Sequence, residues 1–209
     1  MKKLLLIALL FITASSFGQS AKAVFESDKM VWFGLDFTNA KMIGMSDESP
    51  STIKDVYFRA WNGVILDQPE KFKLDRFFRK ESVIKDVEQV GKRNSKVDPD
   101  QLASYNEKEI TNDMVNEIIK GFNTGNIKEG VGLIFIVESF NKSAREAVFH
   151  VAFFDIVSKK VLLTKRVTGL PSGFGLRNYW GNAVYSALQR IDRGLYKEWK
   201  DESMKLKAN

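Results

Sequence analysis

The 209-residue chain has no cysteine and only one histidine. Without cysteine, it has no disulfide, no thiolate zinc site, no cysteine-ligated iron–sulfur cluster and no thiol nucleophile. With one histidine, it cannot build a site that needs two imidazoles. The chain also has no G-x-S-x-G, P-loop or dinucleotide-binding motif. These absences exclude several large enzyme classes and leave binding proteins and carboxylate-based enzymes open.

Hydrophobic residues make up 44% of the chain and aromatic residues 12%, so the sequence has ample material for a core. It contains no internal repeat, low-complexity tract or linker that would separate two domains. We therefore expect residues 1–18 to be a signal peptide, residues 24–200 to form one domain, and residues 201–209 to be a charged tail that frays.

The first residues have the layout of a secretory signal peptide. Met1, Lys2 and Lys3 precede the apolar run LLLIALLFI, and the small and weakly polar residues TASSFGQS follow. Nine apolar residues fall short of the roughly 20 that span a bilayer. We expect cleavage after Gly18, with cleavage after Ala23 or retention as an uncleaved membrane anchor as alternatives. Because there is no lipobox cysteine, we expect a periplasmic or secreted protein that is not lipid-anchored.

Signal cleavage also changes the charge. Loss of Lys2 and Lys3 reduces the formal net charge from +6 to +4. This excess is too mild to indicate a nucleic-acid-binding protein, which needs cations gathered on one face.

The first half of the mature sequence predicts alternating strands and helices. Residues 30–37 read as a strand covered on both faces, with Val31, Phe33, Leu35 and Phe37 on one of them. A helix follows from a Ser49 cap and Pro50 to about Asp67. This half also contains a short helix around Phe72 to Phe78 and an edge strand over 82–90. A loop over 101–108 and a helix over 112–122 complete it. The stripe of the first helix consists of Ile53, Val56, Tyr57, Ala60, Trp61, Val64 and Ile65.

Three strands with short connections are predicted over 131–140, 146–157 and 161–168, and short connections require antiparallel neighbours. A long helix with an apolar stripe from Leu176 to Leu195 follows. The expected fold class is α/β (α+β). It consists of a single mixed sheet, mainly antiparallel in its C-terminal half, flanked by helices that include a long C-terminal one.

The segment 71–96 concentrates positive charge. It has nine basic and four acidic residues, with Phe72, Phe77 and Phe78 interleaved. In an exported protein such a segment favours an acidic partner surface or a polyanionic envelope component. The alternative is a solvated face above core phenylalanines. The basic residues are Lys71, Lys73, Arg76, Arg79, Lys80, Lys85, Lys92, Arg93 and Lys96.

The loop 169–175 is rich in glycine and precedes the last long helix, a geometry that cradles anions. Gly173, Gly175 and Arg177 are its candidate ligand-binding residues. A plain connection between strand and helix is the alternative.

Carboxylates near predicted strand ends give a weaker candidate site. Asp36, Glu138 and Asp155 would support acid–base chemistry or a hard cation only if they converged. Asp155 is more simply explained as the end of a strand ahead of a turn, and His150 as a hydrogen-bonded histidine within a sheet. The sequence therefore predicts no catalytic residue, no metal site and no cofactor.

The segment from Gly130 to Leu188 consists of a strand, a hairpin and a glycine-rich loop leading into a long helix. Within it, FDIVSKKVLLTKRVTG resembles a hairpin found in a group of bacterial envelope proteins. The group includes the curli-secretion lipoprotein, the lipoprotein activators of penicillin-binding proteins and the amino-terminal domain of the Tol-system β-propeller protein. The resemblance implies a mixed sheet flanked by helices and a role in assembly or partner regulation. It carries over no catalytic residue.

The leading functional expectation is an exported, non-catalytic binding or accessory protein of the bacterial cell envelope. Its partner would be an envelope protein or a polyanionic envelope component. One alternative is a carboxylate-dependent hydrolase. Another is a small-ligand carrier that uses the loop 169–175, with a large pocket lined by Trp32, Trp61 or Trp180.

Overall fold

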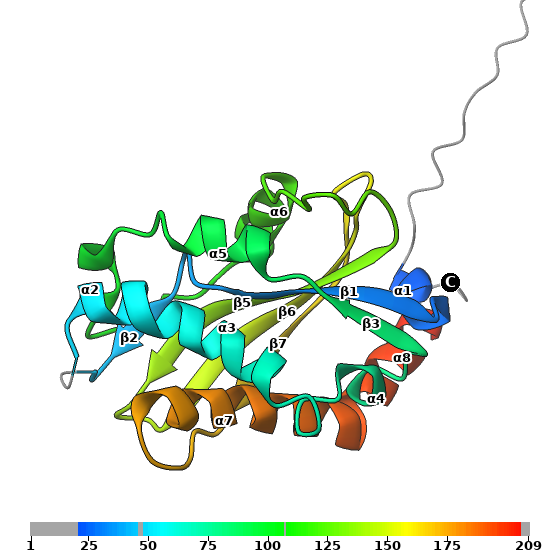
Figure 1. Ribbon diagram of the computed structural model, residues 1–209. Helices are drawn as coiled ribbons and strands as arrows, with labels where there is room; N and C mark the ends of the chain where they lie inside the picture. The colour runs from blue at the N-terminus through cyan, green and yellow to red at the C-terminus, as the bar shows by residue number, and fades with distance from the viewer. Residues whose placement is uncertain (1–20, 46–47, 107, 206–209) are drawn as a thin grey trace, which may run out of the picture.

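Seven strands form one mixed sheet with helices on both faces (Figure 1). This architecture comes from a computed structural model, which describes residues 21–45, 48–106 and 108–205. The predicted signal peptide and residues 206–209 lie outside the described residues. The predicted fold class is confirmed.

One half of the sheet is parallel. Its order is β3 (Ser82–Lys85), β1 (Lys29–Asp36), β5 (Val131–Asn141), β2 (Lys41–Ile43) and β4 (Ala103–Ser104). β1 pairs with the first part of β5 and β2 with its last residues, so β1 and β2 form one interrupted strand along the same edge.

The other half is antiparallel, as the short connections predict. β5 pairs with β6 (Glu146–Asp155), which pairs with β7 (Val161–Gly169). The β5–β6 register shifts between Val137 and Ser139, which leaves Glu138 at an irregular position of the ladder.

Two helical layers cover the sheet, as Figure 1 shows. One face carries α3 (Phe58–Asp67) and α7 (Leu176–Arg190) over the larger apolar cluster, which includes Trp32, Trp61 and Trp180. The other carries α5 (Glu88–Asn94) and α6 (Asn112–Lys120) over a smaller cluster. The remaining helical elements are α1 (Ala21–Glu26), α2 (Pro50–Thr52), η1 (Ile53–Tyr57), α4 (Leu74–Phe77), η2 (Pro99–Gln101), η3 (Ile191–Leu195) and α8 (Tyr196–Lys205).

The prediction that four apolar residues share one face of the first strand is wrong. Val31 and Phe33 pack in the smaller cluster, whereas Leu35 and Phe37 pack in the larger one. The register of β1 against β5 shifts between Trp32 and Leu35. This bulge moves every later side chain to the opposite face.

The helix predicted from Pro50 to Asp67 is continuous, and Ser49 accepts a hydrogen bond from the Thr52 N–H as its cap. Its middle, η1, is π-helical. The wider turn takes Val56 out of the predicted stripe, and Val56 is exposed.

The C-terminal helix also runs further than predicted. α8 extends to Lys205, five residues into the segment expected to be a tail. Trp199 and Ser203 are buried, and the Ser203 hydroxyl donates to the Trp199 carbonyl at 2.8 Å. Among the described residues, no helix is long and apolar enough to cross a membrane.

Candidate functional site

The edge of β1 is only partly covered by a neighbouring strand. β3 pairs with β1 from Lys29 to Trp32, and the Asp86 N–H donates a last bond to the Trp32 carbonyl. The chain then turns away into α5. The remaining backbone of β1 would be left with unsatisfied polar groups, which are costly when buried.

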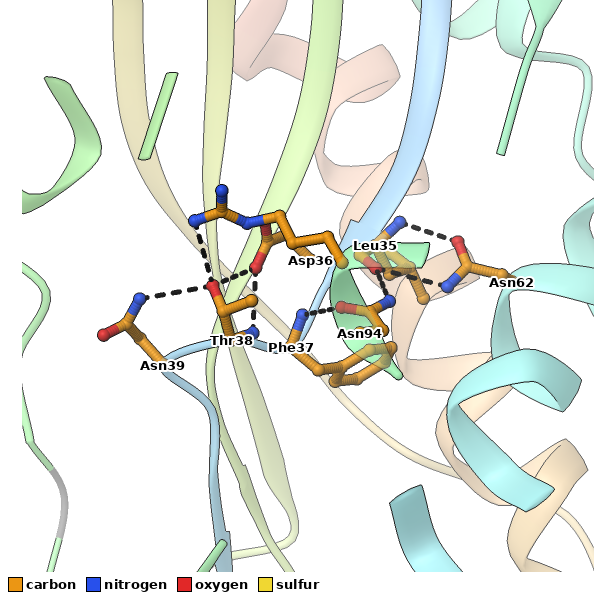
Figure 2. Close-up of polar contacts among 8 residues, drawn as sticks. Leu35, Asp36, Phe37, Thr38, Asn39, Asn62 and Asn94 are labelled. Atoms are coloured by element: carbon orange, nitrogen blue, oxygen red, sulfur yellow. Dashed lines mark hydrogen bonds and ion pairs between the residues drawn. The ribbon is translucent and has the colours of Figure 1, made fainter. Parts of the chain in front are cut away.

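Two asparagines close this edge in place of a strand (Figure 2). Asn62 of α3 accepts from the Leu35 N–H at 2.8 Å and donates to the Leu35 carbonyl at 3.2 Å. Asn94 of α5 donates to the same carbonyl at 2.8 Å and accepts from the Phe37 N–H at 2.8 Å. Both amides are buried, so α3 and α5 are tied to opposite sides of one strand edge.

Gly34 makes this approach possible. Its φ is +96°, and a β-carbon there would lie 2.4 Å from the Asn62 Oδ1. Any side chain would therefore displace the amide that closes the edge, and the backbone angle itself disfavours other residues.

A groove of about 400 Å³ lies above this edge, between α3 and α5. The buried amides of Asn62 and Asn94 lie at its base, and Phe58, Leu66 and Val87 form apolar walls. This volume is within the roughly 300–1,000 Å³ of small-molecule sites. Because the Asn62 and Asn94 amides already hydrogen-bond to the backbone of β1, the interior favours an apolar occupant.

Two glycines in the helices widen this groove. Gly63 of α3 and Gly91 of α5 both line it. A β-carbon at Gly91 would meet no atom within 4 Å, and one at Gly63 would meet only the Asp67 carboxylate at 3.9 Å. Glycine within a helix costs about 1 kcal/mol relative to alanine. Neither glycine makes a close contact that a β-carbon would block, so the space beside each of them is open.

The mouth of the groove carries charge. Lys54 and Asp55 of η1 pair at 3.3 Å, and the exposed Arg59 has no ion-pair partner among the described residues. The groove thus combines apolar walls with one unneutralised cation at the rim.

Beside the groove, the end of β1 is held by an ion pair. The Asp36 carboxylate is fully buried and lies 2.7 Å from the Arg93 Nε. It also accepts from the backbone N–H of Thr38 at 2.8 Å and from its hydroxyl at 2.5 Å (Figure 2). Asp36 and Arg93 therefore anchor α5 to the turn between β1 and β2.

Glu138 forms a separate network on the sheet. Its buried carboxylate lies 2.7 Å from the His150 Nε2, accepts from Arg166 at 2.7 Å, and accepts from the Ile110 N–H at 3.2 Å. Burial raises the pKa of Glu138, but the hydrogen bonds from His150 and Arg166 outweigh it and lower the pKa to about 2. His150 is thus a hydrogen-bonded histidine within the sheet, as the sequence favours.

The three candidate carboxylates do not form one cluster, because Asp155 lies apart from the other two, whereas Asp36 pairs with Ile136 of β5, two residues before Glu138. Asp155 accepts from the N–H and the hydroxyl of Ser158, as expected of a residue that ends a strand at a turn. It lies opposite Val131, seven residues before Glu138 in β5, which is about 23 Å along the strand. Among the described residues, no group of three or more acidic or histidine side chains is placed to hold a metal ion.

The basic residues of 71–96 have different surroundings. Lys80 is buried and donates to the carbonyls of Val24 and Ser27, and burial lowers its pKa to about 8. Arg79 donates to the Asp192 carbonyl, and Lys92 pairs with Glu88. Arg93 holds Asp36. Only Lys71, Lys73 and Arg76 gather around one hollow.

The glycine-rich loop has an exposed apolar tip. Gly173 and Gly175 both have positive φ, and Phe174 between them is 96% exposed. Arg177 donates to Asp67 at 2.7 Å and so holds α7 to α3. Trp32, Trp61 and Trp180 are fully buried in the core and do not line the groove.

Asn62, Asn94 and Gly34 were not among the predicted site residues. One signal was present: Asn62 and Gly63 are consecutive helix-disfavoured residues inside a strong helical pattern. Comparison with known proteins adds no assignment, since no protein-family model and no curated protein matches the chain.

Proposed function

We propose that this chain is a non-catalytic binding protein of the bacterial cell envelope, and that the groove between α3 and α5 is its ligand site. The carrying observation is the pair of glycines, Gly63 and Gly91, which keep the groove open although the fold has room for larger residues. Export is supported by the signal-peptide layout of the first residues.

The proposed ligand is a small amphiphile with an apolar body and one anionic group. The apolar walls take the body, because the amides at the base are already used by β1. Arg59 at the rim meets the anionic group. The hydrolase alternative loses the three-carboxylate site on which it depended, because Asp155 lies apart from Asp36 and Glu138. The groove replaces the loop 169–175 as the proposed ligand site.

Anilinonaphthalene sulfonate, an apolar dye with one sulfonate, tests this site. We expect saturable binding to the mature protein, and at least tenfold weaker binding to Gly91→Leu because its side chain fills the groove. Gly194→Leu is the matched control, since a β-carbon there also meets nothing within 4 Å but lies in η3. Equal binding by Gly91→Leu and the unsubstituted protein would overturn the proposal.

The role of the rim cation is tested with an uncharged analogue of the dye, phenylnaphthylamine. Arg59→Gln should weaken the sulfonate dye several-fold and leave the neutral dye unchanged. Equal effects on both dyes would contradict an anion-binding role for Arg59.

A further inference from the structure

We propose a second and independent binding site: the hollow between α4 and the C-terminal helix binds a phosphate group. The hollow has a volume of about 230 Å³. Four cations line it, Lys71, Lys73, Arg76 and Arg193, against two acids, Glu70 and Asp192. The excess positive charge is local and arises from segments more than 100 residues apart in the chain.

Several donors in this hollow are unused. Arg193 has no ion-pair partner among the described residues. The nearest acidic atom to Arg76 belongs to Asp192 at 3.9 Å, which is beyond the range of a charge-assisted hydrogen bond. Lys73, by contrast, pairs with Glu70 at 2.8 Å. Arg76 and Arg193 therefore offer two guanidinium groups to an incoming anion.

Lys71 is held in position before any ligand arrives. Its Nζ donates to the Asn182 Oδ1 and lies 5.0 Å from the centre of the Tyr185 ring. Burial lowers the pKa of Lys71. An ammonium has three donors, so two remain for a ligand.

This donor set fits phosphate chemistry. Guanidinium groups pair with phosphate oxygens in bidentate fashion, and an ammonium adds a compact charge. Asp192 and Arg193 come from the π-helical η3, and such irregular turns often present functional side chains. Glu70 and Asp192 offset two of the four cations, so the lining keeps an excess of two positive charges.

Calorimetric titration with inorganic pyrophosphate at low ionic strength tests the site. We expect one-site binding that weakens at least tenfold in Arg193→Gln and in Arg76→Gln. Lys92→Gln, which removes the same charge from α5, should bind as tightly as the unsubstituted protein. Absence of binding, or equal weakening by Lys92→Gln, would overturn the proposal.

The same variants identify the source of the phosphate. If the protein floats with phosphatidic acid vesicles but not with phosphatidylcholine vesicles, and Arg193→Gln loses this flotation, the phosphate belongs to a lipid headgroup. Pyrophosphate binding without flotation would assign a soluble phosphate ester. Because Gly91→Leu leaves this hollow untouched, failure of dye binding and failure of phosphate binding are separate results.

Discussion

At the scale of single residues, Glu138 is a buried ionisable group held by several hydrogen bonds. It gathers donors from His150, Arg166 and the Ile110 backbone, which belong to β6, β7 and the segment before α6. The Glu138 carboxylate thus ties β6 and β7 to the segment that precedes α6. The network therefore gives the fold electrostatic support at this position.

Acid should remove this support in a defined pH window. The pKa of Glu138 falls from 4.5 to about 2 on folding. Between these values the unfolded chain binds more protons, so stability is fully present above pH 4.5 and is lost as the pH falls toward 2. The shift corresponds to about 3 kcal/mol. Urea titrations from pH 2 to 5 should show a smaller pH dependence in Glu138→Gln.

Glu129→Gln, on an exposed residue, is the control for that titration. It should keep the pH dependence of the unsubstituted protein. If Glu138→Gln keeps it as well, the network does not account for acid sensitivity.

At the scale of elements, β1 is shared between two kinds of neighbour. β3 covers its first half as an ordinary parallel strand, and two amide side chains cover the second half. This substitution of side chains for a strand lets α3 and α5 separate and form the groove. The fold therefore makes its candidate site at the point where regular pairing stops.

Asn94→Ala should open this edge locally. The Phe37 N–H loses its acceptor, whereas the Leu35 carbonyl keeps the Asn62 amide. A buried donor left unpaired costs about 1–3 kcal/mol. We expect urea unfolding to show this loss in the free energy of unfolding, and we expect the Phe37 backbone amide to exchange its hydrogen faster. The exposed Asn116→Ala on α6 should change neither quantity, and unchanged exchange at Phe37 in Asn94→Ala would contradict the edge-closing role.

At the scale of the whole molecule, the two ends of the described chain pack together. α1 and α8 lie at the same end of the sheet (Figure 1), and the ring centroids of Phe25 and Tyr196 are 5.2 Å apart. Val24 is fully buried, and its carbonyl accepts from Lys80 at 2.5 Å. A cleavage within α1 would therefore affect the core directly.

The two alternative cleavage positions of the predicted signal peptide differ in their effect on the stability of the fold. Cleavage after Gly18 leaves α1 whole, whereas cleavage after Ala23 removes its first turn and places a new ammonium near Lys80. We expect a chain that starts at Val24 to unfold at a lower temperature than one that starts at Gln19. N-terminal sequencing of the exported protein should find Gln19. Equal melting temperatures would contradict this structural preference.

The sequence alone determined most of the longer strands and helices, because periodicity and turn residues act locally. The edge strand predicted over 82–90 is wrong in its second half, since β3 ends at Lys85 and α5 begins at Glu88, and the predicted loop 101–108 contains the short strand β4. It predicted the β5–β6–β7 meander, the long C-terminal helix, the Ser49 cap and the mixed sheet. It also indicated that Lys71, Lys73 and Arg76 belong to a cationic cluster, although it placed Lys80 and Arg93 there too.

Only the tertiary structure decided what those elements place together. The bulge at Gly34 and the closure of β1 by Asn62 and Asn94 each depend on a partner distant in sequence. Arg193 and Lys71 line the same hollow although more than 100 residues separate them in the sequence. The groove and the hollow are spaces between elements, and local sequence patterns describe the elements but not the distance between them.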